Sequence, residues 1–318
     1  MIARVPRIVS HLPDAVTGRV ASHASRPQLL RSASDAPPWD VPDGAEVLLT
    51  RPSAGWFKAP AAPPRGWPFG LRWIEVTSTG VDWFPSWLFD GPSVTCGRGI
   101  NAVPIAEYVL AAVLLHEKRL DELRVYGPAD WRQAPLGGLE GKTLGLVGFG
   151  SIGRAVARRA QAFGLRVTAL RRGGADTGDP SVVSAWSLQD LVAEADHLVL
   201  AVPLTPETAK LIDRDILSRV KPGQHLVNIA RGGLIDQEAL VAALDDGRLA
   251  AATLDVTDPE PLPDGHPLYT HPRVRLTPHV SWSAPDGDER LARKVLDNLD
   301  RYVAGAPLAD LVDPARGY

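Results

Sequence analysis

Short apolar runs bounded by turn residues recur along the chain and predict buried β-strands. In the second half of the chain these runs occupy 143–147, 166–170, 197–202, 225–229, 251–256 and 274–276. Between the first two, Ile152, Val156 and Ala160 fall on one face of a predicted helix, and Gly164 closes that helix. Alternation of strands and helices predicts a parallel sheet with helices on both faces and right-handed crossovers.

The first half of the chain contains three further apolar runs, at 46–50, 71–78 and 93–96. The segment 32–68, which surrounds the first of these runs, is rich in Pro, Ala and Gly, and we expect loops on both sides of that run. The segment 101–124 has an apolar face at helical spacing and Pro104 near its start, which predicts a long helix.

A last amphipathic helix is predicted at 286–304, beyond the last predicted strand, so it can pack back on the N-terminal part of the chain. The pattern therefore predicts an α/β protein of two doubly wound parallel-sheet domains, Rossmann-like or flavodoxin-like, with an active-site cleft between them. We place one domain at 105–286 and the other at 1–104 plus 287–318.

Composition narrows the class of protein without naming its chemistry. The chain has 318 residues, a net charge of −3 and 45% hydrophobic residues, which is ordinary for a globular protein. This charge gives no electrostatic reason to expect nucleic acid or a membrane surface as partner, and no apolar stretch is long enough to span a bilayer. A single cysteine, Cys96, excludes an internal disulfide framework, and there is no metal-ligand cluster. For the same reason we expect no metal ion. Since no signal peptide is recognisable, we expect a cytoplasmic protein.

The hexapeptide 148–153 reads Gly-Phe-Gly-Ser-Ile-Gly and lies between a predicted strand and a predicted helix. Gly148 permits a tight turn, Gly150 lets the backbone approach a pyrophosphate, and Gly153 lets the helix pack close to the strand. The amides of Ser151, Ile152 and Gly153 then point at the anion. The string alone also fits an ordinary glycine turn, but its context favours a dinucleotide site. The domain at 105–286 is therefore expected to bind the dinucleotide.

Two arginines, Arg171 and Arg172, follow the second predicted strand of this domain. Enzymes that use NAD place an acidic residue near this position to hold the ribose 2′-hydroxyl. Guanidinium groups instead bind a 2′-phosphate bidentately. We therefore favour NADP(H) over NAD(H), while NAD(H) and a merely solvated basic pair remain alternatives.

Three later segments complete a specific pattern. They read Asn-Ile-Ala-Arg-Gly-Gly-Leu-Ile-Asp at 228–236, Leu-Asp-Val-Thr-Asp-Pro-Glu-Pro-Leu-Pro at 254–263 and Leu-Thr-Pro-His at 276–279. Together with 148–153 they resemble the D-isomer-specific 2-hydroxyacid dehydrogenase family, most closely its NADPH-dependent glyoxylate/hydroxypyruvate reductases. The resemblance runs from about residue 77 to the C-terminus, whereas the first seventy residues match weakly. It implies reduction of a small 2-oxo acid to a D-2-hydroxy acid by hydride transfer from NADPH.

The resemblance assigns catalytic roles to three residues, and their chemistry is compatible with those roles. Arg231 follows a strand end, and its guanidinium can clamp the carboxylate and carbonyl oxygens of a 2-oxo acid. His279 would protonate the carbonyl oxygen during reduction, and Glu260 would hold its imidazole with a proton available near neutrality. His266 and His271 are nearby alternatives, but His279 ends a strand at the expected cleft edge.

The resemblance also implies further contacts. Cofactor contacts are expected from Val202, Pro203, Thr208, Ile229, Ala230 and Asp255. Asp255 would orient the nicotinamide amide. In the substrate domain, Thr79 and Gly80 would receive the substrate carboxylate, and Asn101 would border the cleft. Trp282 either shapes the substrate pocket or serves packing alone.

Some features leave the function open. Thr257 stands where the family commonly has an aromatic residue, and Glu260 argues against the formate dehydrogenase type. No regulatory extension follows the last predicted helix, which disfavours the serine-regulated phosphoglycerate type. The apolar helix 101–124 suggests a homodimer, as the family implies. A cofactor-sensing corepressor-like protein and a dehydrogenase of another substrate, such as phosphite, remain alternatives.

Overall fold

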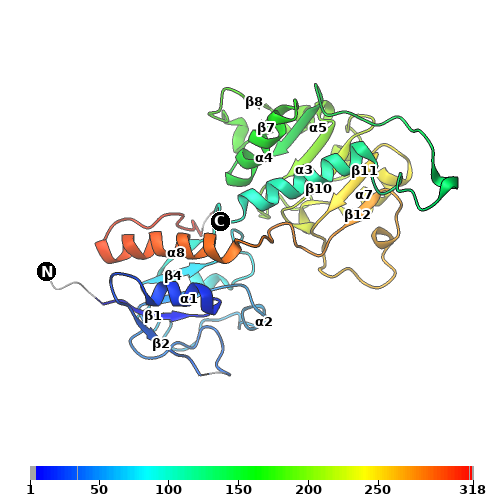
Figure 1. Ribbon diagram of the computed structural model, residues 1–318. Coiled ribbons are helices and arrows are strands. Elements are labelled where there is room, and N and C mark those ends of the chain that lie inside the picture. Colours follow the sequence, from blue (N-terminus) through cyan, green and yellow to red (C-terminus); the bar gives the residue numbers. More distant parts are fainter. Residues whose placement is uncertain (1–4, 34, 315, 317–318) are drawn as a thin grey trace. The chain divides into compact units, whose positions relative to one another are not determined.

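The computed structural model describes residues 5–33, 35–314 and 316, so the outermost ends of the predicted substrate domain lie outside the described residues. The chain folds into two compact units (Figure 1). One unit comprises Met1–Asn101 and Ala284–Tyr318, and the other comprises Ala102–Ser283. The chain thus leaves the first unit, forms the whole of the second, and returns. Within the described residues, no helix is long and apolar enough to cross a membrane.

The second unit is built on a seven-stranded parallel sheet of order β12-β11-β10-β9-β6-β7-β8. Its strands are β6 (Thr143–Val147), β7 (Arg166–Leu170), β8 (Val183–Ser184), β9 (His197–Leu200), β10 (His225–Asn228), β11 (Ala251–Leu254) and β12 (Val274–Leu276). The chain moves outward from β6 to β8 and then returns to β9 on the other side of β6. This reversal creates a switch point at the carboxyl ends of β6 and β9, where open α/β sheets bind ligands.

Helices cover both faces of this sheet. The helices α3 (Ala102–Lys118) and α4 (Ser151–Ala162) cover one face, and α5 (Leu188–Glu194), α6 (Arg214–Leu217) and α7 (Gln237–Asp245) cover the other. Successive strand residues point to opposite sides, so Leu198 joins the second group and Val199 the first. Because both faces are buried, the strands appear in the sequence as continuous apolar runs.

Some predicted elements are longer than the observed ones. The helix predicted at 101–124 ends at Lys118, because Arg119 adopts a left-handed backbone with φ of 49°. The strands β9, β10 and β11 are also shorter than the apolar runs that predicted them, and each ends one or two residues earlier. At those points the chain turns into loops at the carboxyl edge of the sheet.

The first unit contains, among its described residues, a five-stranded parallel sheet of order β2-β1-β3-β4-β5. Its strands are β1 (Arg7–Ser10), β2 (Gln28–Leu30), β3 (Val47–Thr50), β4 (Trp73–Val76) and β5 (Ser93–Cys96). Its helices are α1 (Asp14–Ala21), α2 (Ala54–Phe57) and α8 (Gly287–Ala304), and the 3-10 turn η1 spans Ser86–Phe89. The helices α1 and α8 lie side by side over one face (Figure 1), and an aromatic cluster around Trp56 and Trp87 covers the other. The predicted α/β class with two parallel sheets is confirmed.

Candidate active site

The loop 148–153 follows β6 at the switch point, and its geometry shows why positions 148 and 153 are glycine. Gly148 has φ of 103°, and a Cβ there would lie 2.5 Å from the carbonyl oxygen of Ala201. A Cβ on Gly153 would lie 2.5 Å from the carbonyl oxygen of Gly148, so the start of α4 can approach β6 only without a side chain. A Cβ on Gly150 would meet no described atom within 4 Å.

Gly150 caps α4, so the amides of Ser151, Ile152 and Gly153 belong to its first turn. Amides at this position have no acceptor within their own helix, and the helix dipole adds partial positive charge. The loop therefore combines an open approach at Gly150 with a group of donors suited to a phosphate anion.

The two arginines lie at the carboxyl end of β7, beside the glycine loop. The amide of Gly148 donates to the carbonyl of Leu170, 2.9 Å away, which ties the loop to this strand end. Arg171 is exposed and its Nη1 donates to the carbonyl oxygen of Asp176 at 2.6 Å. Arg172 is also exposed and begins a 3-10 turn, η3 (Arg172–Gly174). Both cations thus lie at the strand end expected to face the adenosine ribose.

The loop after β9 holds the predicted contacts Val202, Pro203 and Thr208. The Thr208 hydroxyl donates to the carbonyl of Pro203 at 2.7 Å and accepts from the amide of Thr205 at 2.8 Å. The pKa of Glu207 is lowered by the hydroxyl of Thr205, by its own backbone amide and, to a smaller extent, by the charge of Arg172. The loop after β9 therefore lies within electrostatic reach of the end of β7.

Arg231 follows β10, and Asn228 at the end of that strand shapes the turn that carries it. The side-chain Nδ2 of Asn228 donates to the carbonyl of Arg231 at 2.8 Å, and its Oδ1 accepts from the backbone amide of Ala230 at 3.1 Å. A Cβ on Gly232 would lie 1.9 Å from the carbonyl carbon of Thr257. The glycine thus lets the arginine loop lie directly against the loop after β11. The predicted contact Ile229 is buried beneath this turn.

His279 follows β12, and its Nδ1 lies 2.9 Å from Oε2 of Glu260, which follows β11. A carboxylate can only accept, so Nδ1 carries the proton of this hydrogen bond. The amide of Thr257 donates to the other Glu260 oxygen at 3.1 Å. Burial raises the pKa of Glu260, but His279, the Thr257 amide and the charge of Arg231 outweigh it and hold the pKa below its ordinary value. The three predicted catalytic residues therefore lie on three neighbouring strand ends, with Glu260 ionised.

The backbone of His279 is in the left-handed region, with φ of 52°, which is uncommon for a residue other than glycine. Its amide donates to the carbonyl of Asp255 at 2.8 Å, and its carbonyl accepts from the indole of Trp282 at 2.7 Å. The Asp255 carboxylate is buried and accepts from the Thr277 hydroxyl and from the amides of Val280 and Ser281. Asp255 and Trp282 thus fix the loop that presents His279.

The anchoring by Asp255 was not foreseen from the sequence, although a carboxylate directly after a strand was a usable signal. The two alternative histidines have other contacts. The ring of His266 accepts from the amide of Leu268 at 3.3 Å, and that of His271 lies 3.3 Å from Asp245. Both residues lie in the segment that leads into β12, whereas His279 follows that strand.

Thr79 and Gly80 lie in the first unit, on the loop after β4. The Thr79 hydroxyl donates to the carbonyl of Gly97 at 3.2 Å. Asn101 is the last residue of this unit before the chain enters α3. In the same unit, Trp56 is 1% exposed in the core, whereas its neighbour Phe57 is 57% exposed and packs on Trp83.

Comparison with known proteins identifies the same family as the motifs. The chain matches a model described as D-isomer specific 2-hydroxyacid dehydrogenase, NAD binding domain, over residues 110–281. It is 37% identical to the D-3-phosphoglycerate dehydrogenase of Mycobacterium bovis over 98% of this chain, and it spans only 58% of that relative's length. It is 34% identical to the glyoxylate/hydroxypyruvate reductase A of Serratia proteamaculans, covering 68% of this chain and 69% of the relative.

A solved structure gives the same result for the fold. A D-isomer specific 2-hydroxyacid dehydrogenase from Xanthobacter autotrophicus, in complex with NADPH and MES, superposes with a TM-score of 0.80 at 26% identity. The match covers 99% of this chain and 100% of the other. The family resemblance inferred from the motifs is confirmed.

Proposed function

The chain belongs to the D-isomer-specific 2-hydroxyacid dehydrogenase family, and we propose that it reduces a small 2-oxo acid to the D-2-hydroxy acid with NADPH as hydride donor. The observation that carries this proposal is the pair of His279 and Glu260, 2.9 Å apart, at the ends of β12 and β11, with Arg231 at the end of the next strand, β10. A proton donor and a cation at the same edge of a sheet suit the reduction of a charged carbonyl compound.

In the proposed reaction each of these side chains handles charge. Arg231 binds the carboxylate and carbonyl oxygens of the substrate through its planar fork. His279 gives the proton on Nε2 to the carbonyl oxygen, because Nδ1 donates to Glu260. The ionised Glu260 stabilises the imidazolium before that transfer and holds the ring in one orientation. In the reverse direction the same imidazole accepts the proton from the hydroxyl group.

We place the dinucleotide on the unit Ala102–Ser283 and assign substrate binding in part to the other unit. The open approach at Gly150 and the three amides after it fit a pyrophosphate. Arg171 and Arg172 fit a ribose 2′-phosphate, which supports NADPH over NADH. When bound, the reduced nicotinamide supplies the hydride. Asp255 keeps its proposed role toward the nicotinamide amide, and Thr79 and Gly80 keep theirs toward the substrate carboxylate.

The test is oxidation of NADPH and NADH, followed by absorbance, with a panel of 2-oxo acids. The panel contains glyoxylate, hydroxypyruvate, phosphohydroxypyruvate and sulfopyruvate. We expect turnover of glyoxylate or hydroxypyruvate, with NADPH preferred. Faster turnover of phosphohydroxypyruvate would instead place the protein with the phosphoglycerate dehydrogenases. Tight cofactor binding without turnover of any 2-oxo acid would contradict the proposal and favour a cofactor-sensing protein, and oxidation of phosphite alone would favour the other alternative.

We further propose that the protein is a homodimer, but not through the apolar face of α3. That face is buried in the unit's own core, at positions such as Val109 and Val113. The segment 119–140 that follows α3, green in Figure 1, extends away from the sheet of its unit. Five of its large apolar side chains are exposed: Leu120, Val125, Tyr126, Trp131 and Leu136.

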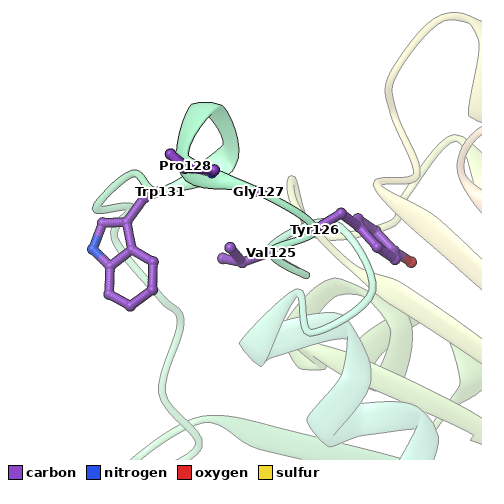
Figure 2. Close-up of a pocket in the computed structure, with 5 residues that line it drawn as sticks. All are labelled: Val125, Tyr126, Gly127, Pro128 and Trp131. Carbon is purple, nitrogen blue, oxygen red and sulfur yellow. The ribbon is translucent and has the colours of Figure 1, made fainter.

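Tyr126 and Trp131 are 79% and 82% exposed and, with Val125 between them, line a hollow of about 500 Å³ (Figure 2). A second copy exposes the same surface, so a two-fold symmetric contact would bury both. We expect a dimer by light scattering. A variant with Tyr126→Ser and Trp131→Ser should be monomeric, whereas Trp186→Ser, which changes a side chain 87% exposed elsewhere in the same unit, should remain a dimer.

A further inference from the structure

The side chain of Arg154 connects two parts of the proposed cofactor site. It projects from the first turn of α4, and its guanidinium carbon lies 4.6 Å from the centre of the Phe149 ring in the glycine loop. Its Nη2 donates to the carbonyl oxygen of Thr177 at 3.0 Å, in the loop between β7 and β8. The glycine loop and the loop that follows Arg171 and Arg172 are thus joined through one side chain.

The loop between β7 and β8 is built around Thr177, which is fully buried. The amide of Thr177 donates to the Ser184 hydroxyl at 3.0 Å, and its own hydroxyl contacts the carbonyls of Asp179 and Val182. Ser184 belongs to β8, which pairs with β7. The far end of the loop is therefore fixed to the sheet.

The near end of the loop holds the arginine that we propose to bind the 2′-phosphate. Arg171 donates to the carbonyl of Asp176 at 2.6 Å, and Arg154 donates to the carbonyl of the next residue. Between Arg171 and Asp176 the chain contains Gly173 and Gly174, both with positive φ. Because glycines give this stretch little conformational restraint of its own, the two arginine contacts and the Thr177 network must fix where the Asp176 carbonyl lies.

The charge of Arg154 also acts on the same loop. Hydrogen bonds from Ser181 are the main cause that lowers the pKa of Asp179, and the charge of Arg154 lowers it further. Arg154 therefore donates a hydrogen bond to a carbonyl of this loop and acts on its Asp179 carboxylate through charge, while its guanidinium lies over the Phe149 ring. Aromatic stacking and a directed hydrogen bond at once require the planar guanidinium of arginine rather than an ammonium.

We propose that Arg154 is a positioning residue for cofactor selectivity: it holds the loop between β7 and β8 so that Arg171 is pre-arranged for a ribose 2′-phosphate. This inference rests on the proposed preference for NADPH. Arg154 itself touches neither the reacting atoms nor, in this proposal, the phosphate. Its loss should therefore weaken binding of the 2′-phosphate and leave the pyrophosphate contacts at 148–153 largely intact.

The experiment measures binding of 2′,5′-ADP and of 5′-ADP by calorimetry to the full chain. Arg154→Met keeps an apolar contact with Phe149 and removes the hydrogen bond and the charge. We expect its affinity for 2′,5′-ADP to fall roughly tenfold and that for 5′-ADP to change by less than about twofold. Arg154→Lys should restore only part of the loss. Arg158→Met, which removes an exposed arginine from the same helix, should bind both ligands like the wild type.

The possible results distinguish the role of Arg154 from the NADPH preference on which it rests. If the wild type binds 2′,5′-ADP more tightly than 5′-ADP and Arg154→Met keeps that difference, the role of Arg154 is wrong and the cofactor preference stands. Equal weakening of both ligands by Arg154→Met would show a general structural role and also overturn the inference. If the wild type itself does not distinguish the ligands, the NADPH preference fails, and the role of Arg154 fails with it.

Discussion

The Nδ1 atom of His279 and the Oε2 atom of Glu260 lie 2.9 Å apart, although the two residues come from loops after different strands. The carboxylate stabilises the protonated imidazole, so Glu260→Gln should weaken that form. We expect kcat for reduction to fall by roughly 10- to 100-fold, with the alkaline limb of the pH profile moved to lower pH. Steady-state rates across the pH range, with cofactor affinity measured separately, check this. A profile that keeps its wild-type position would contradict the pairing.

The planar fork of Arg231 is the basis of the second prediction. Arg231→Lys keeps the charge, but an ammonium cannot form two parallel hydrogen bonds to a carboxylate and carbonyl. We expect kcat/KM for the 2-oxo acid to fall by about 100-fold or more while the cofactor still binds. Near-normal kcat/KM in this variant would refute the clamp. Arg273→Lys is a matched control, because Arg273 binds the carbonyl of Leu244 at the opposite end of the strand β12.

The third prediction concerns Arg171 and Arg172. Replacing both with Ser removes the two cations at the end of β7 and should raise KM for NADPH by roughly 10- to 100-fold. KM for NADH should change little, because NADH has no 2′-phosphate. Parallel measurements with both cofactors decide the matter. Equal effects on the two KM values would show that these arginines support the fold or the pyrophosphate rather than select the cofactor.

The sequence predicted six of the seven described strands of the second unit, because strands buried on both faces are continuous apolar runs, and it missed the two-residue edge strand β8. It missed β1 and β2 in the first unit, where short runs such as Gln28–Leu30 have no periodicity to detect. Neighbours in sequence also differed: Trp56 is buried and Phe57 is exposed, although both are large and apolar. Hydrophobicity alone cannot separate them, since the difference depends on which way a short helix faces.

For the site, local motifs pointed to Arg231, Glu260 and His279, and the structure brings their strand ends together. The contacts that fix their positions were not visible in the sequence. Gly232 is required by its approach to Thr257, 25 positions along the chain, and Asp255 holds the backbone amides of the His279 loop. Such contacts depend on how loops from different strands meet, which no local pattern encodes.

A buried carboxyl group in the first unit gives the last prediction. Glu75 on β4 is fully buried, and its Oε2 accepts from the Thr95 hydroxyl and from the Asn298 amide, 3.0 Å away on α8. Among the described residues its Oε1 has no hydrogen-bond partner. Burial is the main cause that raises the pKa of Glu75 to about 7 from 4.5, against the opposing hydrogen bonds and the charge of Lys294.

The sign of the effect on stability follows from the two pKa values. Between pH 4.5 and about 7 the folded protein keeps the Glu75 proton while the unfolded chain has lost it. Folding then takes up a proton, so the free energy of unfolding falls as pH rises through this window and is constant above it. At about 1.4 kcal/mol per pH unit, the loss from this group is roughly 3 kcal/mol. Glu75→Gln mimics the neutral acid at all pH values and should remove this slope.

Denaturant unfolding of the first unit, followed by tryptophan fluorescence between about pH 5 and pH 7.5, measures the slope directly. We expect Glu75→Gln to be more stable than the wild type at the upper end of this range and similar to it at the lower end. The control is Glu289→Gln, because Glu289 is an exposed carboxylate on α8 whose removal leaves the buried group unchanged. If Glu75→Gln follows the wild-type pH dependence throughout, Glu75 is ionised in the folded protein and its neighbours, rather than burial, control its charge.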